Sequence, residues 1–172
     1  GDDIVQPGRV DGGRRPEARV SVLESFVPLV LNAPCVADAA IARVDAAFED
    51  APYASLKGEG TLQGLGPEFI DEGTLVSKIG RTTGVTRGKI TAFELDNVEV
   101  RYGLGLVRFD NQIEIRSTTR RPFSQGGDSG SLIYTTRDRR AVALLFAGND
   151  DGLTYATPIR AALDALNVDL LT

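Results

Sequence analysis

Histidine is absent from all 172 residues of this sequence. Any catalytic mechanism that needs an imidazole base from within these residues is therefore excluded. Cysteine is nearly absent too, because Cys35 stands alone and cannot form an internal disulfide. A single cysteine slightly favours a reducing compartment, although secreted proteins without disulfides also exist. The small apolar neighbours of Cys35 predict a buried structural residue.

Long apolar runs and excess positive charge are also missing. The longest apolar stretches, residues 27–34 (VPLVLNAP) and 141–148 (AVALLFAG), are far shorter than the roughly 20 residues that a membrane-spanning helix requires. The net charge is −5, and the only lysines are Lys57, Lys78 and Lys89. Because nucleic-acid binding usually requires a basic face, the sequence predicts neither a nucleic-acid partner nor a membrane span.

The composition that remains is that of a globular protein. Hydrophobic residues make up 42% of the chain and charged residues 25%. The length fits one ordinary domain or two small halves that share a core. A glycine-rich stretch over 58–73 is the best candidate linker. We therefore place an N-terminal half in 1–65 and a C-terminal half in 66–172.

Short β-rich runs follow one another from residue 74 onward, separated by Gly, Asn and Asp. Their spacing is typical of a β-barrel or β-sandwich. Earlier in the chain, the β-branched residues of 19–31 favour an extended segment, whereas 38–48 fits a short strand or a helix. The chain ends in a predicted helix that begins after Thr157, the expected N-cap, with Pro158 at its first position.

The motif with the clearest chemical meaning is GGDSGS, residues 126–131. Glycines on both sides of Ser129 allow a tight turn that directs the backbone N–H groups of Gly127 and Ser129 to one point. Such a pair could hold the oxyanion of a tetrahedral intermediate. A glycine- and serine-rich hairpin loop without catalytic function is the alternative reading of the hexapeptide alone.

In its order of elements, the sequence resembles chymotrypsin-like (trypsin-fold) serine proteases. GGDSGS is preceded by VSKIGRTTGVTRGKI (76–90) and followed by AVALLFAG (141–148) and a C-terminal TPIRAAL segment. The similarity is greatest to a disulfide-free bacterial branch in which DAAIA (38–42) carries the catalytic aspartate. The resemblance implies an all-β fold of two six-stranded antiparallel β-barrels, the first incomplete here, with a C-terminal helix. It implies no metal or organic cofactor. The location is not fixed by the resemblance, but the absence of internal disulfides slightly favours the bacterial cytoplasm.

The resemblance also implies catalytic roles for individual residues. Ser129 would be the nucleophile, and the N–H groups of Gly127 and Ser129 would form the oxyanion hole. Asp38 would orient the general-base histidine, although an aspartate before an apolar run is otherwise usually a cap or turn residue. Asp128 matches the residue that binds a freed amino terminus in trypsin-type zymogens, a role for which the GDDI start offers no apolar activation sequence.

Substrate-binding residues follow from the same resemblance. Phe146, Ala147 and Gly148 would form the strand that pairs with the backbone of a peptide or protein substrate, along the primary specificity pocket. Phe123, six residues before Ser129, would lie at the base of that pocket. An apolar residue at the base favours an uncharged substrate side chain over Arg or Lys.

The resemblance breaks at the general base. The family places its histidine before the aspartate, but none of the 37 residues before Asp38 is histidine. The stretch DIVQPGRVDGG resembles the part of the family sequence that follows the histidine loop. We therefore expect the first strands of barrel one to be missing and the chain alone to be inactive or nearly so. A Ser–Lys dyad with Lys78 or Lys89 is an unsupported alternative.

Three explanations for the missing histidine remain open from the sequence. The chain could be the larger product of a proteolytic cut, with histidine on a cleaved N-terminal fragment that stays bound as a partner. It could be a truncated fragment. It could also be a pseudoprotease that acts as a peptide-binding or scaffolding module. The intact GGDSGS motif favours the first two, and an oligomer is compatible with each.

Overall fold

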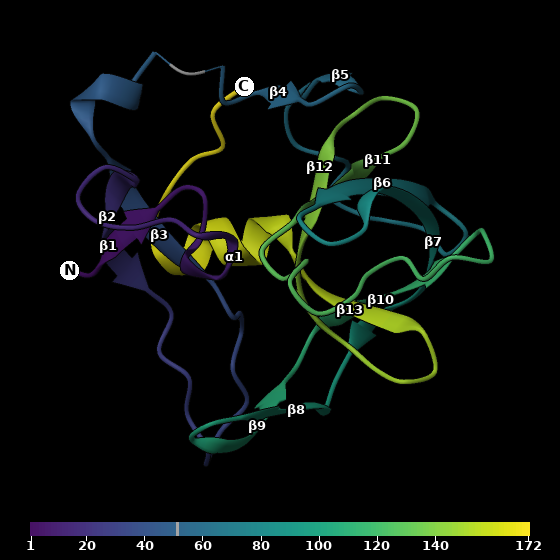
Figure 1. Ribbon diagram of the computed structural model, residues 1–172. Helices are drawn as coiled ribbons and strands as arrows, with labels where there is room; N and C mark the ends of the chain where they lie inside the picture. The colour runs from purple at the N-terminus through teal and green to yellow at the C-terminus, as the bar shows by residue number, and fades with distance from the viewer. Residues whose placement is uncertain (51) are drawn as a thin grey trace.

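The computed structural model describes residues 1–50 and 52–172, and its regular structure is almost entirely β (Figure 1). The strands run over Asp3–Val5 (β1), Arg19–Phe26 (β2), Ala40–Val44 (β3), Ser55–Leu56 (β4), Gly60–Thr61 (β5), Leu75–Gly80 (β6), Gly84–Leu95 (β7), Val98–Tyr102 (β8), Gly105–Phe109 (β9), Gln112–Ser117 (β10), Leu132–Thr135 (β11), Ala141–Gly148 (β12) and Leu153–Pro158 (β13). Helical segments cover Arg9–Asp11 (η1), Ala46–Phe48 (η2) and Ile159–Leu166 (α1). None of the helices in the described ranges is long and apolar enough to cross a membrane.

The C-terminal half forms a closed six-stranded barrel in the order β10-β13-β12-β11-β6-β7. All neighbouring strands in this barrel are antiparallel. Alternation along the strands sends one set of side chains inward. The core contains Val76, Ile90, Ile113, Ile115, Phe123, Ile133, Val142, Ala143, Leu145 and Ala156. The predicted all-β, barrel-type fold is therefore confirmed.

The N-terminal half contributes a three-stranded antiparallel sheet in the order β1-β2-β3. Residues 19–26 are extended, as predicted, and the ambiguous 38–48 segment resolves into β3 followed by the short η2 helix. Within the described residues this sheet does not close, so β1 and β3 are edge strands. Phe26 of β2 is 60% exposed, which leaves apolar surface uncovered on this sheet.

Helix α1 lies between the N-terminal sheet and the barrel (Figure 1). Its Ala162 packs with Ala37 and Ala39 of the first half, together with Val27 and Leu144. The helix begins one residue later than predicted, because Pro158 is the N-cap and no side chain caps the helix. The hydroxyl of Thr157 donates instead to Gln112 Oε1 (2.9 Å), a buried contact between neighbouring strands.

The β8–β9 hairpin extends from the barrel and packs over its outer face. Val98, Val100 and Tyr102 on its inner side contact a cluster of Cys35, Val107, Phe109 and Phe146. A turn in which Asn111 has φ 58° separates β9 from β10. Cys35 N–H donates to the carbonyl of Arg108 in β9 (2.8 Å), so the hairpin contacts the segment that leads into Asp38.

Candidate active site

Ser129 lies exposed on a tight turn between Phe123 and β11. Backbone hydrogen bonds fasten this turn to β12: Gly130 N–H donates to the carbonyl of Leu145 (2.7 Å), and Leu145 N–H donates to the carbonyl of Ser131 (3.0 Å). The Ser131 hydroxyl also donates to the carbonyl of Asp128 (2.6 Å). These hydrogen bonds hold the backbone on both sides of Ser129 in place, and its side chain is exposed.

The two N–H groups predicted to form an oxyanion hole have no protein acceptor. Within the described residues, neither Gly127 N–H nor Ser129 N–H donates a hydrogen bond. Gly127 has φ +95°, a left-handed conformation that favours glycine. A Cβ atom at this position would lie 2.6 Å from Thr82 Oγ1 and 2.9 Å from an Arg81 guanidinium nitrogen. The turn therefore requires glycine here, and it leaves two donors for an incoming oxygen.

Asp128 anchors the same turn from below through an extensive set of hydrogen bonds. Its Oδ1 accepts from Thr82 N–H (2.7 Å) and Thr83 N–H (3.2 Å), and its Oδ2 accepts from Gln125 N–H (3.0 Å) and the Thr83 hydroxyl (2.7 Å). Burial alone would raise the pKa of Asp128. The hydrogen bonds from Thr83, Gln125 and Thr82 outweigh it and lower the pKa to about 2.

The counter-ion of Asp128 is Lys78, from β6. Their nitrogen and oxygen lie 3.3 Å apart, and both side chains are fully buried. Lys78 Nζ also donates to the Thr83 hydroxyl and packs over the ring of Phe123, 5.8 Å from its centroid. Burial lowers the pKa of Lys78, and the charge of Asp128 opposes this effect. Asp128 is thus paired by a lysine within the fold, not by an amino terminus.

Asp38 enters the site from the N-terminal half. Its neighbours Ala37 and Ala39 are buried against helix α1. Because side chains alternate along an extended segment, Asp38 faces the opposite way. Its Oδ2 accepts a 2.7 Å hydrogen bond from the hydroxyl of Tyr102 at the end of β8. Burial, then this hydrogen bond and the charge of Asp38, raise the pKa of Tyr102.

The structure brings Asp38 and Ser129 to one pocket. This pocket has a volume of about 350 Å³ and is lined by Asp38, Ala39, Ala40, Ser129, Gly130, Leu144, Leu145 and Phe146. A nucleophile and a carboxylate from different halves of the chain therefore border the same space.

A second pocket of about 540 Å³ lies on the other side of Ser129. Ala147 and Gly148 border it together with Pro122, Ser124, Gln125, Gly126, Leu145, Asn149, Asp150, Gly152 and Leu153. The hydroxyl of Ser124 is 2.6 Å from that of Thr154, and this pair forms a polar group beside the pocket. Phe146 lies elsewhere: its ring is buried against Phe109, with 4.7 Å between ring centroids.

The predicted place of Phe123 at the base of this pocket is wrong. Its side chain has no exposed surface and lies in the barrel core against Lys78. Its carbonyl accepts from the Thr86 hydroxyl (2.7 Å), which fixes the backbone of this segment. Ser124, the next residue, lines the pocket instead, because successive side chains of an extended segment point to opposite sides.

Among the described residues, no basic side chain forms a hydrogen bond with Ser129. Ser129 Oγ makes only a long contact, 3.4 Å, to the carbonyl of Phe146. Lys78 is committed to Asp128 and Thr83, and Lys89 is exposed on β7 without a contact to Ser129. The Ser–Lys dyad therefore finds no support. The described residues also contain no cluster of acidic or cysteine side chains suited to a metal ion.

Comparison with known proteins supports the chymotrypsin-type fold. Residues 70–154 match the family described as Nal1 C-terminal domain. No curated protein matches the sequence. The structure is similar to bacterial chymotrypsin-like serine proteases, so the chain has the chymotrypsin fold.

Three of the similar solved structures illustrate the extent of this likeness. A glutamic-acid-specific serine protease that uses a histidine triad in substrate binding is 26% identical, with a TM-score of 0.60 over 89% of this chain and 74% of that one. The chymotrypsin of Cellulomonas bogoriensis is 23% identical, with a TM-score of 0.59 over 94% and 80% of the two chains. The alpha-lytic protease homologue N4 is 23% identical, with a TM-score of 0.57 over 94% and 81%.

Proposed function

We propose that this chain is the serine-bearing body of a chymotrypsin-like endopeptidase. The observation that carries the proposal is the meeting of Ser129 and Asp38 at one pocket, beside two backbone N–H groups that lack acceptors. Backbone donors of this kind, held in place before the reaction, supply much of the transition-state stabilisation in acyl transfer.

In this mechanism Ser129 Oγ attacks the carbonyl carbon of the scissile peptide bond. Its proton passes to a histidine base that Asp38 orients. The carbonyl oxygen becomes an oxyanion and accepts hydrogen bonds from the N–H groups of Gly127 and Ser129. The base then protonates the leaving amine, which leaves an acyl-enzyme on Ser129. Water, deprotonated by the same base, hydrolyses that ester and restores the serine. No metal or organic cofactor takes part.

The histidine of this mechanism is not among the 172 residues, so another polypeptide segment must supply it. We propose the chain's own cleaved N-terminal fragment. The sheet β1-β2-β3 has two edges without strand partners in the described residues, and Phe26 exposes apolar surface there. Unpaired strand edges are surfaces on which a further strand can bind. The chain without this fragment would be inactive or nearly so.

We propose that the pocket beside Ser129 takes an uncharged substrate side chain. Leu145, Leu153 and Ala147 supply apolar lining, and Ser124 adds a hydroxyl. The one charged residue at this pocket is Asp150, which is exposed. A substrate glutamate would meet no cationic partner in this lining. The histidine triad of the glutamate-specific relative also has no counterpart in a chain without histidine.

The second candidate function is a peptide-binding or scaffolding module without catalysis. The long Ser129 contact to a carbonyl and the lack of any base among the described residues favour it. The two functions share the substrate-binding strand and differ in the chemistry of Ser129.

Hydrolysis of a peptide mixture by the protein, isolated as its own cell produces it, tests the proposal. We expect cleavage by the wild type and a loss of about a thousandfold or more in Ser129→Ala. Ser55→Ala, a change at an exposed serine far from the site, is the matched control. Equal cleavage by wild type and Ser129→Ala would reject Ser129 as the nucleophile. Peptide binding with no cleavage would favour the module.

A further inference from the structure

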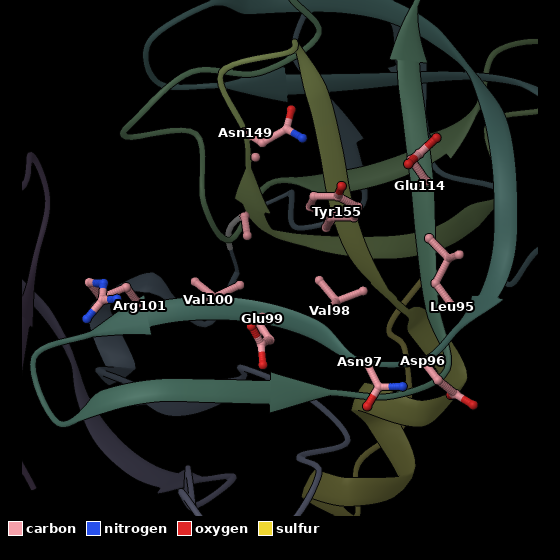
Figure 2. A pocket seen from close by; sticks show the side chains of 12 residues that line it. Leu95, Asp96, Asn97, Val98, Glu99, Val100, Arg101, Glu114, Asn149 and Tyr155 are labelled. Carbon is pink, nitrogen blue, oxygen red and sulfur yellow. The ribbon is translucent and has the colours of Figure 1, made fainter.

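A pocket of about 630 Å³ lies between the β8–β9 hairpin and the outer face of the barrel (Figure 2). It is separate from the pocket at Asp38 and from the pocket beside Ser124. Ala147 and Gly148 border it as well, so the end of β12 stands between this pocket and the one beside Ser129. None of the functional roles assigned above uses it.

Strand register explains which side chains face this pocket. Ala147 of β12 is paired with Tyr155 of β13, and Tyr155 is paired with Glu114 of β10. The three residues therefore form a row across the outer face of the barrel. Ile113 and Ile115, on either side of Glu114, point into the core. A carboxylate, an aromatic ring and a small residue are thus placed side by side.

The hairpin supplies the opposite wall. Val98 and Val100 project from β8 toward Tyr155, whereas the carboxylate of Glu99 points to the other side of the strand (Figure 2). Both valines pack against the cluster that includes Tyr155 and Ala147. The wall between the two valines and Tyr155 is therefore apolar. The polar and charged residues that also border the pocket are Asp96, Asn97, Glu99, Arg101, Glu114 and Asn149.

Glu114 carries the charge of the row formed by Ala147, Tyr155 and Glu114. Its Oε1 accepts the hydroxyl of Thr91 (2.7 Å), and its other carboxylate oxygen accepts no hydrogen bond from any described residue. The hydroxyl of Tyr155 is also without a partner among these residues. Burial, followed by the charges of Glu114 and Asp151, raises the pKa of Tyr155. The nearest cation on β8, Arg101, is exposed and makes no ion pair with Glu114 among the described residues.

The neighbouring strand edge offers a way for a peptide to reach both pockets. The backbone pairing of β11 with β12 ends at Leu144, and the Ser129 turn bonds only to Leu145. Phe146–Gly148 therefore keeps one edge without a backbone partner in the described chain. A peptide extended along this edge would direct alternate side chains to opposite sides. One side chain could enter the pocket beside Ser129 while another enters the Glu114 pocket.

We propose that the Glu114 pocket binds the cationic side chain of a lysine or arginine in the peptide that lies along Phe146–Gly148. A long side chain of this kind places its methylene stem on Val98, Val100 and Tyr155 and its charge at Glu114. A cation beside the Tyr155 ring gains a further cation–π attraction. A neutral apolar side chain would cover Glu114 without pairing it, which costs free energy. The position of the peptide rests on the proposed function, whereas the cation preference rests on the pocket alone.

The first test measures the pocket without a peptide. The protein is titrated by NMR with Nα-acetyl-lysine methylamide and, as the uncharged analogue, Nα-acetyl-norleucine methylamide. We expect the lysine compound to shift the amide signals of Glu114, Tyr155 and Val98, and Glu114→Gln to abolish these shifts. Glu24→Gln, which removes an exposed carboxylate on β2 that does not border the pocket, is the matched control and keeps them. No shift at these residues in the wild type would overturn the proposal.

The second test links the pocket to the peptide. Two labelled peptides differ only in having lysine or norleucine directly before the residue that enters the pocket beside Ser129, because neighbouring side chains of an extended peptide point to opposite sides. We expect the lysine peptide to bind roughly five- to tenfold more tightly at low salt, with the difference reduced at high salt and lost in Glu114→Gln. Equal affinities in the wild type would contradict the proposed peptide path. A lysine preference that survives while Ser129 proves unreactive would reject the protease function and retain this site.

Discussion

Lys78 Nζ lies 3.3 Å from a carboxylate oxygen of Asp128, and solvent reaches neither side chain. Asp128 immediately precedes Ser129, so this ion pair fixes the backbone that carries the candidate nucleophile and the oxyanion donors. The pair is internal to the barrel, because Lys78 belongs to β6. The turn is thus held in its shape without a contribution from a chain terminus.

Replacement of Lys78 by methionine leaves Asp128 buried without its counter-ion. We expect a loss of about 3–5 kcal/mol in the free energy of unfolding. Lys57→Met, at an exposed lysine, should change it by less than about 0.5 kcal/mol. Urea unfolding of both variants measures the difference. Equal stability of Lys78→Met and the wild type would mean that the ion pair does not hold the turn.

The low pKa of Asp128 makes stability depend on pH in acid. In the folded state this pKa is about 2, below the ordinary value of 3.8, so the native state favours the ionised form. The contribution, about 2 kcal/mol, is fully present above about pH 4 and is lost as the pH falls toward 2.

The free energy of unfolding, measured from pH 5 to pH 2, checks this dependence. Asp128→Asn should be less stable at pH 5 and should show a shallower decline in acid. Asp138→Asn, at an exposed residue of the β11–β12 turn, should decline as the wild type does. Parallel profiles for Asp128→Asn and the wild type would refute the assignment.

Gly80 lets the backbone of β6 approach the same ion pair closely. A Cβ at this position would lie 2.4 Å from Asp128 Oδ1 and 2.8 Å from Lys78 Nζ. We expect Gly80→Ala to lower the free energy of unfolding by about 2 kcal/mol, because the clash displaces buried charged atoms. Gly103→Ala, where a Cβ would meet nothing within 4 Å, is the control. Equal melting temperatures of Gly80→Ala and Gly103→Ala in thermal unfolding would contradict this prediction.

The hydrogen bond from Tyr102 to Asp38 connects the hairpin of the barrel to the N-terminal half. Removal of the hydroxyl in Tyr102→Phe should cost about 1 kcal/mol. A double-mutant cycle with Asp38→Ala isolates the pair, and we expect a coupling energy of similar size. Strictly additive effects of the two substitutions would show that the contact does not exist in solution.

Much of this architecture could be predicted from the sequence, since alternating apolar residues and glycine- or asparagine-containing turns mark the barrel strands. The candidate site was harder to predict from the sequence. Ser129 and Gly127 belong to a local motif, but the partners of Asp128 and Asp38 are distant in the chain. Lys78 and Tyr102 carry no local signal of their roles, because only the closure of the barrel and the packing of the hairpin bring them to these carboxylates.

Phe123 illustrates how a single residue predicted to line the pocket beside Ser129 lies in the barrel core instead. Its sequence distance from Ser129 matched the pocket base, but a large apolar side chain gains more free energy in the core than at a solvent-filled pocket. The backbone therefore directs Phe123 inward and Ser124 toward the pocket. The proposed role of Glu114 could not be predicted from the sequence either, because it depends on the cross-strand pairing of Glu114 with Tyr155.

The most direct test of the proposal that Ser129 is an activated nucleophile uses the natively produced protein. The folded protein is treated with a fluorophosphonate probe, and its intact mass is measured under denaturing conditions before and after this reaction. We predict one probe adduct, located on Ser129, and a second polypeptide in the sample that contains histidine. Ser129→Ala should remain unlabelled. If the chain that carries Ser129 stays unlabelled while a histidine-bearing fragment is bound to it, Ser129 is not an activated nucleophile and the endopeptidase proposal fails.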